Sequence, residues 1–413
     1  MKLVLSFLVG LLFLFSCKKG DTSQSNSTSQ IQPVYKNYLQ TSYELQKSNV
    51  TADLIALRNK NGASSNYFIM AVAYLDVNGD GQDDIFMCDP SVTQSGRAKG
   101  QLFIYKNGDY IFDSSYFPTP PTLIAPRKAI IGDYNKDGMP DIFITGHGDD
   151  LPPFPGEYPE LLMSNSSKKY DLVKFTNKIG FYHGACSGDI DNDGDLDIFV
   201  LGKTNSYFLI NDGKGNFTYS TSTIDTNYLD QEYTCELVDI DKDGYLDLIM
   251  GGHEFGVIDS TTFTNLNGID GSTRIYWGNS SFKYDIKNMI NIPIVSNWGV
   301  ITDLDVYDLD GDGKNEILVT RSGGRKNDFT TYFYDGWNLQ VVQLNNRIAV
   351  DASNIFIENN IYIPIIPNNQ EWIPWMRFVD FDNNGKIDFF STKCTTLPFL
   401  RWELRNNKLI RVN

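Results

Sequence analysis

The chain has 413 residues, of which 41% are hydrophobic and 13% aromatic, and its formal net charge is −16. This composition supports a sizeable core and excludes a protein with many membrane spans. The acidic balance, with no basic stripe, argues against nucleic acid as a partner. We therefore expect a soluble folded body.

The N-terminus differs from the rest. Lys2 precedes an apolar or small run over residues 3–15, which is typical of a secretory signal and short for a bilayer-spanning helix. Ser16-Cys17 after Leu14-Phe15 resembles the lipobox of bacterial lipoproteins, although Phe15 is larger than the usual residue there. An ordinary signal peptide with an incidental cysteine is the alternative.

The lipobox resemblance implies that residues 1–16 are a signal peptide and that Cys17 becomes the lipidated first residue. The following stretch, KKGDTSQSNSTSQ, is polar and rich in Ser and Thr, so residues 17–33 are interpreted as a flexible tether. Lys18 after the cysteine implies an exported, outer-membrane lipoprotein that faces the periplasm or the cell surface. The membrane is then a partner through the lipid.

Residues 34–413 contain six copies of one acidic motif, which begin at Asp76, Asp133, Asp189, Asp239, Asp308 and Asp380. The third copy reads DIDNDGDLD. Position 1 is always Asp, position 3 is Asn or Asp, position 5 is Asp except at Asn384, position 6 is always Gly, and position 9 is Asp except at Glu316.

These identities suit a hard cation, because calcium takes six to eight oxygen ligands. Side chains at positions 1, 3, 5 and 9 and the carbonyl at position 7 converge if glycine at position 6 turns the loop sharply. Up to six calcium ions are predicted, and the sixth site is expected to be the weakest because Asn384 removes a charge. The predicted ligands are Asp76, Asn78, Asp80, Gln82, Asp84, Asp133, Asn135, Asp137, Met139, Asp141, Asp189, Asp191, Asp193, Asp195, Asp197, Asp239, Asp241, Asp243, Tyr245, Asp247, Asp308, Asp310, Asp312, Lys314, Glu316, Asp380, Asp382, Asn384, Lys386 and Asp388.

Each motif lies between two short apolar segments and is followed by two aromatic segments with a turn signal, such as YFLINDGKGNF. The pattern predicts a four-stranded meander, A to D, with the acidic loop between strands A and B. Position 12 is not acidic, which argues against a helical EF-hand. Radial stacking buries both faces of such sheets, so the fold class is all-β, a β-propeller. The pattern is compatible with six or with seven blades: residues 345–370 are a candidate for part of a degenerate seventh blade, and residues 34–66 are a candidate for a ring-closing strand.

The motifs resemble the FG-GAP or VCBS repeats of bacterial surface proteins and integrin α-subunit propellers, over residues 67–412. The resemblance implies calcium in the A–B loops. It implies no activity, because such repeats serve adhesins, lectin-like modules and lyases alike.

The meander topology places the B–C loops and the D–A connections on the face opposite the acidic loops, and this face is where a functional site is expected. All three histidines of the chain are expected there, together with nearby acids at Asp149, Asp150, Glu157 and Glu254. Aromatic platforms beside imidazoles suit a ligand site. The candidate ligand-binding residues are Arg127, His147, His183, Tyr233, His253, Trp298 and Trp375, with Trp372 beside them.

The preferred function is a calcium-stabilised, membrane-anchored module that binds a glycan or a protein ligand. The alternative is a polysaccharide-active enzyme, a lyase or hydrolase, although no catalytic motif names a reaction and no catalytic residue is assigned. A structural subunit of an envelope complex is a third possibility. The distances between the three histidines discriminate between the binding module and the enzyme. If the histidines lie more than about 15 Å apart, they cannot act together on one substrate, and the enzyme loses its basis.

The cysteines other than Cys17 show neither zinc-site spacing nor a dense disulfide framework. Cys186 and Cys235 occupy similar places in neighbouring repeats, so a disulfide between them and a pair of buried free thiols both stay open.

Overall fold

The computed structural model describes residues 54, 57, 71–203, 206–224, 232–254, 273–323, 334, 336–358, 372–379, 388–391 and 400–412. The chain divides at residue 33 into two units, and every described residue belongs to the second, Val34–Asn413. Cys17, the proposed signal peptide and the tether lie outside the described residues. Within the described part, no helix has the length and apolar character needed to cross a lipid bilayer.

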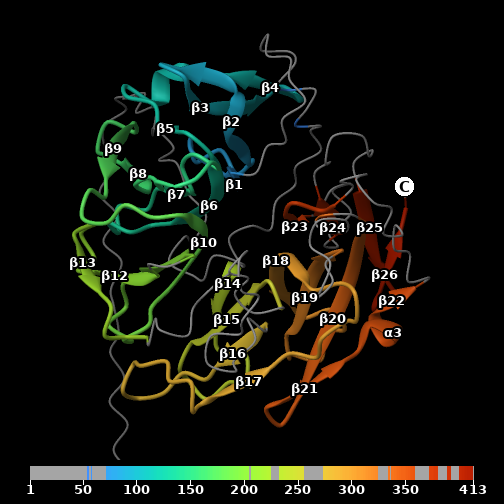
Figure 1. The fold of residues 1–413 in the computed structure, drawn as a ribbon. Helices are drawn as coiled ribbons and strands as arrows, with labels where there is room; N and C mark the ends of the chain where they lie inside the picture. The colour runs from blue at the N-terminus through green and yellow to red at the C-terminus, as the bar shows by residue number, and fades with distance from the viewer. Residues whose placement is uncertain are drawn as a thin grey trace, which may run out of the picture. The chain divides into compact units, whose positions relative to one another are not determined.

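The described strands of the second unit form six antiparallel sheets that follow one another around a ring, as a β-propeller (Figure 1). Blades 1 to 3 come first in the chain. Their strands are β1 Ala71–Leu75, β2 Asp84–Gln94, β3 Arg97–Lys106, β4 Asp109–Phe112 and β5 Thr122–Leu123; β6 Pro126–Gly132, β7 Asp141–Gly146, β8 Glu160–Ser164 and β9 Tyr170–Lys174; and β10 Tyr182–Gly188, β11 Asp197–Gly202, β12 Tyr207–Asn211 and β13 Phe217–Ser220.

Blades 4 to 6 complete the ring. Their strands are β14 Glu232–Val238, β15 Asp247–Gly252, β16 Arg274–Tyr276 and β17 Met289–Asn291; β18 Val300–Tyr307, β19 Glu316–Ser322, β20 Trp337–Asn345 and β21 Ile348–Asp351; and β22 Ile357–Glu358, β23 Met376–Val379, β24 Asp388–Ser391, β25 Leu400–Arg405 and β26 Lys408–Arg411. Two single turns of helix, η1 Ser114–Tyr116 and α3 Ser353–Phe356, lie between strands.

The number of blades is therefore six. Residues 348–351 form the last strand of blade 5, and β22 pairs in parallel with β26 as a fifth strand of blade 6. The prediction that residues 345–370 could contribute to a seventh blade is wrong for their described part, because this segment extends two existing sheets. Of residues 34–66 only Leu54 and Leu57 are described, and both are buried against blade 1.

The innermost strand is the first strand of blades 1 to 5 and β23 in blade 6, and these inner strands contact one another in order, from β1 through β6, β10, β14 and β18 to β23. Blade 6 meets blade 1 through Trp375, which packs with Val72 and Tyr74, and through Arg377, whose Nη2 donates to the carbonyl of Val72 at 3.5 Å. The ring is thus closed by side-chain packing between blades.

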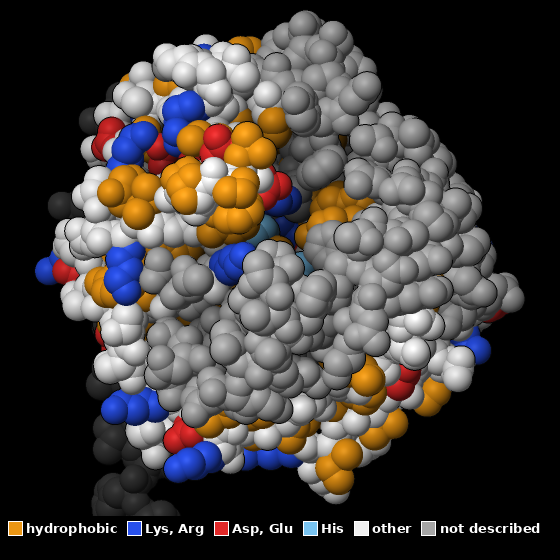
Figure 2. Space-filling model, in the orientation of Figure 1, with side chains coloured by type: hydrophobic (Ala, Val, Ile, Leu, Met, Phe, Trp, Pro, Cys, Tyr) orange, Lys and Arg blue, Asp and Glu red, His pale blue; other side chains and the backbone are white. Residues whose placement is uncertain are grey.

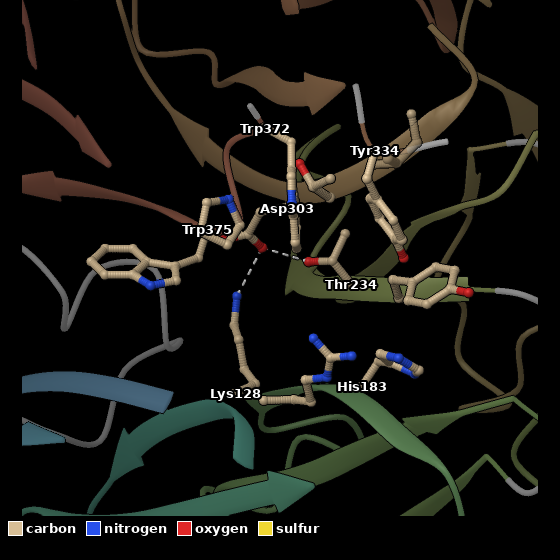
Figure 3. A pocket seen from close by; sticks show the side chains of 12 residues that line it. Lys128, His183, Thr234, Asp303, Tyr334, Trp372 and Trp375 are labelled. Atoms are coloured by element: carbon tan, nitrogen blue, oxygen red, sulfur yellow. Dashed lines mark hydrogen bonds and ion pairs between the residues drawn. The ribbon is translucent and has the colours of Figure 1, made fainter. Parts of the chain in front are cut away.

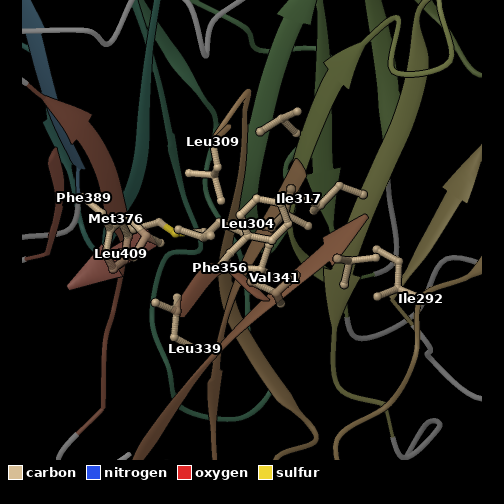
Figure 4. Close-up of a cluster of buried hydrophobic side chains, with 14 of the residues drawn as sticks. Ile292, Leu304, Leu309, Ile317, Leu339, Val341, Phe356, Met376, Phe389 and Leu409 are labelled. Atoms are coloured by element: carbon tan, nitrogen blue, oxygen red, sulfur yellow. The ribbon is translucent and has the colours of Figure 1, made fainter. Parts of the chain in front are cut away.

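Apolar side chains fill the spaces between neighbouring blades. One cluster joins blades 4, 5 and 6 through Ile292, which follows β17, and through Leu304, Ile317, Met376 and Phe389, all nearly inaccessible to solvent (Figure 4). Each leucine- or phenylalanine-sized side chain buried in this way contributes about 1.5–3 kcal/mol. Because inner strands are covered on both faces, they are apolar at successive positions, which explains the continuous runs seen in the sequence.

The meander puts A–B and C–D turns on one face of the ring. Asn407, in the last C–D turn, donates to the carbonyl of Asp310 in an A–B loop at 3.1 Å. On the opposite face, His253 at the start of a B–C loop forms a bridge with Val300 at the start of the next inner strand. We call these the acidic-loop face and the pocket face.

Candidate functional site

A β-bulge recurs at the same place in four inner strands. The register with the neighbouring strand slips by one residue between Pro126 and Lys128 in β6, and equivalent slips occur in β10, β14 and β18. The extra residues are Arg127, His183, Tyr233 and Thr302, and each is the sixth residue before its acidic loop. A bulge lets two successive side chains face the same side of a strand. The ring therefore gains one additional inward side chain per bulged strand.

All four bulge residues line one pocket on the pocket face. Figure 2 shows histidine and basic side chains at the bottom of a hollow near the middle of this face. Aromatic side chains and buried polar groups form the rest of the wall (Figure 3). The lining residues are Arg127, Lys128, His183, Tyr233, Thr234, Ile301, Thr302, Asp303, Tyr334, Trp372, Pro374 and Trp375.

Rings from successive blades follow one another around this pocket. The centroid separations are 5.1 Å for His147–His183, 4.3 Å for His183–Tyr233, 4.4 Å for Tyr233–His253, 6.4 Å for His253–Tyr334 and 4.7 Å for Tyr334–Trp372. The three histidines thus converge, as their positions beside strand ends predict. Their separations are far below the 15 Å that would remove the basis for acid–base chemistry.

His147 is held in place by Glu157, which lies on the same B–C loop. The Glu157 carboxylate accepts hydrogen bonds from the Arg97 guanidinium at 2.7 Å and from the backbone N–H groups of Ile124, Ala125 and Gly148 at 2.8, 3.1 and 3.0 Å. Glu157 is buried. This predicted acid is therefore engaged in fixing the loop, and the same holds for Glu254.

Glu254 fixes the loop after His253. It forms an ion pair with Arg321 at 2.8 Å and accepts a hydrogen bond from Thr273 Oγ1 at 3.0 Å. Arg321 in turn donates to the carbonyl of Trp298 at 3.1 Å. Of the predicted ligand-binding residues, the pocket is lined by Arg127, His183, Tyr233 and Trp375. His147, His253 and Trp298 do not line it, although the rings of His147 and His253 contact those of His183 and Tyr233.

The imidazoles are neutral at ordinary pH. Burial, reinforced by the charge of Arg127, lowers the pKa of His147 to about 3 and holds that of His183 well below its usual range. Burial also lowers the pKa of His253 to about 3. Nδ1 of His183 is buried and has no hydrogen-bond partner in the structure. Neutral imidazoles offer one donor and one acceptor each, as a polar ligand requires.

Beneath the pocket, Asp303 of β18 connects four blades. Its carboxylate lies 3.1 Å from Lys128 Nζ and accepts a hydrogen bond from Thr234 Oγ1 at 2.7 Å (Figure 3). It also lies 3.5 Å from Arg377 Nη1 and accepts a hydrogen bond from the Met376 N–H at 2.9 Å. Although burial raises the pKa of Asp303, Lys128 and Arg377 outweigh it, so the net shift is downward. Charged residues inside apolar strands were the only sequence signal for this network.

The acidic loops have the turn that their glycines predict. Glycine at position 6 has a φ between +83° and +93° in the five described loops, which only glycine adopts readily. In each, the glycine N–H donates to the position-1 carboxylate at 2.9 Å, and the position-9 carboxylate accepts from the position-2 N–H. Of the sixth predicted site only Asp388 is described.

Carboxylates at positions 1, 3 and 9 converge in three loops, where their oxygens lie within 4.8 Å of one another. The groups are Asp189, Asp191 and Asp197; Asp239, Asp241 and Asp247; and Asp308, Asp310 and Glu316. In the first two motifs the position-3 residue is asparagine, Asn78 and Asn135. Position 5 lies outside these groups: Asp193, for example, accepts from the Asp195 N–H at 2.9 Å.

Burial raises the pKa of the position-9 carboxyl to about 7 in all five described loops, because no water compensates the charge. Converging carboxylate oxygens with such an environment fit a hard divalent cation. The loops also contact one another: Lys136 forms an ion pair with Asp195, and Asn192 Nδ2 donates to the carbonyl of Gly244 at 3.4 Å. A cation in one loop would therefore stabilise its neighbours.

Cys88, Cys186 and Cys235 are buried free thiols. Burial raises the pKa of Cys186 well above its usual value, and a hydrogen bond with Cys235 raises it further, so the two side chains are adjacent without a disulfide. Cys394 lies outside the described residues.

Comparison with known proteins agrees with the repeats. Residues 76–144 and 189–250 match the model of the FG-GAP-like repeat. These two matches span the acidic loops of blades 1 to 4. None of the curated proteins compared with the chain matches it.

Three solved structures are similar to the chain at low identity and low TM-score. A lectin of Agrocybe aegerita that recognises non-reducing terminal N-acetylglucosamine is 14% identical, with a TM-score of 0.46 over 82% of this chain and 79% of the lectin. The V. cholerae biofilm matrix protein Bap1 is 16% identical, with a TM-score of 0.36 over 74% of this chain and 41% of Bap1. The BBS1N structure in complex with ARL6DN is 9% identical, with a TM-score of 0.39 over 83% and 94%.

Proposed function

We propose that this chain is a calcium-stabilised, membrane-anchored propeller that binds a glycan or a protein ligand in the pocket of the pocket face. The observation that carries the proposal is the set of aligned bulges, which turn Arg127, His183, Tyr233 and Thr302 into one pocket. Each bulge interrupts the hydrogen bonding between neighbouring strands. Because the bulge occurs at the equivalent position of four inner strands, we infer that the four bulge residues serve one function at the pocket.

The chemistry of the wall supports ligand binding. Aromatic rings with polar tips lie beside neutral imidazoles and a guanidinium, a mixture typical of sites that bind small polar groups. Buried partners fix the loops that carry His147 and His253, so these side chains are held in position before a ligand arrives.

Glycan and peptide arrays probed with the detergent-solubilised full chain, with and without calcium, test this proposal. Trp372→Ala, at the pocket, should remove the array signal. Phe112→Ala, a partly exposed aromatic residue on the outer strand of blade 1, is the matched control and should retain it. An unchanged signal in Trp372→Ala would place binding elsewhere.

Calcium would be held by the carboxylates at positions 1, 3 and 9 of the acidic loops, with the carbonyl at position 7 and the position-5 side chain as further predicted donors. It would supply positive charge to three converging carboxylates, of which the one at position 9 is buried. Isothermal titration of chelated protein with CaCl₂ tests the assignment. Asp247→Asn should remove one binding equivalent, whereas Asp171→Asn on β9 should remove none.

Membrane anchoring rests on the sequence around Cys17. Metabolic labelling with a fatty-acid analogue should mark the wild-type chain and not Cys17→Ser. Labelling of neither protein would contradict the lipid anchor and leave the binding proposal in place.

A polysaccharide-active enzyme is the second candidate, favoured by one observation. His183, Tyr233 and Arg127 share one pocket, with ring centroids of His183 and Tyr233 4.3 Å apart. Partners in acid–base chemistry need such proximity to act on one substrate. Release of reducing ends from a panel of polysaccharides, abolished in His183→Ala, would support the enzyme; release that persists in His183→Ala would contradict it.

A further inference from the structure

Arg347 lies in the two-residue turn between β20 and β21, at a position that favours glycine. Both central residues of the turn, Asn346 and Arg347, have positive φ values, +51° and +62°. The equivalent turn of blade 1 is Asn107-Gly108, with φ values of +55° and +84°. Such turns prefer Asn-Gly because glycine adopts a positive φ without strain. A strained arginine in this place points to a function of its side chain.

The side chain of Arg347 reaches the acidic loop of the neighbouring blade 4. Its Nε forms an ion pair with the carboxylate of Asp241, and its Nη2 lies 2.8 Å from Oδ2 of Asp243. The guanidinium also lies over the ring of the buried Trp277, with its central carbon 4.7 Å from the ring centroid. Arg347 thus connects the C–D turn of blade 5 to the A–B loop of blade 4 and to the residue that follows β16.

Asp241 and Asp243 occupy positions 3 and 5 of the fourth acidic loop, and both are predicted calcium donors. The Asp241 carboxylate is one of three that converge in this loop, together with those of Asp239 and Asp247. The guanidinium of Arg347 and a calcium ion therefore require the same carboxylates.

The third loop offers a matched comparison. Its motif, DIDNDGDLD, has Asp at the same side-chain donor positions as DIDKDGYLD of the fourth loop. A cation also contacts the third loop, because Lys136 forms an ion pair with Asp195, but at position 7 the predicted calcium donor is the backbone carbonyl. Within the described ranges, no ion pair involves Asp191 or Asp193, at positions 3 and 5. The two loops thus differ in whether a cation already holds these two donor side chains.

We propose that Arg347 competes with calcium at the fourth loop, so that this site is weaker than the third and works as a calcium-operated latch between blades 4 and 5. The inference rests on the calcium sites of the proposed function. A guanidinium on two of the donors opposes a divalent cation by charge repulsion and by occupying carboxylate oxygens. The Arg347 side chain is 41% exposed, and exposed ion pairs are weak, so calcium can displace it. Calcium binding then frees the turn of blade 5.

Calcium affinities of matched variants test the inference. Isothermal titration of the chelated, detergent-solubilised full chain with CaCl₂ compares the wild type with Arg347→Met, which removes the charge. We expect one binding equivalent to tighten fivefold or more. The gain should vanish in an Asp247→Asn background, which lacks the fourth site, and persist in an Asp197→Asn background, which lacks the third. Arg405→Met, at an exposed ion pair on blade 6, is the control and should change no equivalent.

Tryptophan fluorescence gives a second readout, because the guanidinium lies over Trp277. The change in emission on adding CaCl₂ should be smaller in Arg347→Met than in the wild type, since no guanidinium leaves the indole. Arg347→Gly, which copies the turn of blade 1, is the second variant in case Arg347→Met does not fold, and it should tighten the same equivalent.

Equal or weaker calcium binding in Arg347→Met would overturn the inference and leave the calcium sites in place. A gain in affinity that persists in the Asp247→Asn background would also overturn it, because the effect would then arise at another loop. Absence of calcium binding in the wild type and in both Arg347 variants would contradict the calcium proposal itself, and the latch with it.

Discussion

Asp303 gives the sharpest test of how the ring is held together. Replacement by alanine removes the carboxylate that Lys128, Arg377, Thr234 and the Met376 N–H share, and these groups come from blades 2, 4 and 6. Both cations are inaccessible, or nearly so, to solvent. Leaving one partner of a buried ion pair without its counter-charge costs about 3–5 kcal/mol.

Urea unfolding followed by tryptophan fluorescence measures this loss. We expect Asp303→Ala to lower the free energy of unfolding by about 3–5 kcal/mol. Asp171→Ala, an exposed residue on β9, should change it by less than about 0.5 kcal/mol. Adding Lys128→Met to Asp303→Ala should recover part of the loss, because the buried charge without a partner disappears.

The reasoning would be refuted if Asp303→Ala stayed within about 1 kcal/mol of the wild type, which is the size of a surface ion pair. It would also be refuted if the two substitutions were additive, since contacting charges must show coupling.

Three further predictions concern the loops and the histidines. If free calcium is present at a hundred times the Kd of a site, its removal by a chelator should lower the free energy of unfolding by about 2.7 kcal/mol for that site. Both Asp197 oxygens accept from backbone N–H groups, of Ile190 at 3.1 Å and Asn211 at 2.8 Å, and asparagine can satisfy only one of them. Asp197→Asn should therefore lower stability in EDTA and lower it further in calcium, and an equal loss in both conditions would contradict this site. Gly244→Ala should cost about 1–3 kcal/mol in urea unfolding, since φ is +93° and free space surrounds the added Cβ, so that strain alone acts. His147 has a pKa of about 3 when folded and about 6.5 when unfolded, so the unfolded chain alone takes up the proton as pH falls below 6.5. From pH 7.5 to 5 the wild type should lose about 2 kcal/mol more than His147→Gln, whereas parallel pH profiles would show that His147 titrates normally.

The acidic loops could be predicted from sequence because their constraint is local. Glycine at position 6 and Asp at position 1 interact within six residues of chain, so the motif alone determines the turn. The blade order followed from the same repeats. The repeats did not predict where the described part of residues 345–370 lies in the fold, because β22 pairs with β26, a strand about fifty residues further along the chain.

Only part of the candidate site could be predicted from local sequence. Strand ends located His147, His183 and His253 on one face, but nothing local distinguishes Glu157, which clamps a loop, from a free acid. Trp298 is not among the residues that line the pocket, and its carbonyl accepts a hydrogen bond from Arg321, which no local sequence feature indicates. Lys128 and Asp303 are 175 residues apart in the chain, and their pairing depends on the ring being closed.

The aligned bulges also have an evolutionary consequence. The side chains at residues 127, 183, 233 and 302 stand outside the register of the sheets, so exchanging them alters what the pocket recognises without disturbing a ladder partner. Selection for a new ligand and selection for folding can then act on separate positions. A library randomised at these four codons would be a compact way to give the same scaffold new specificities.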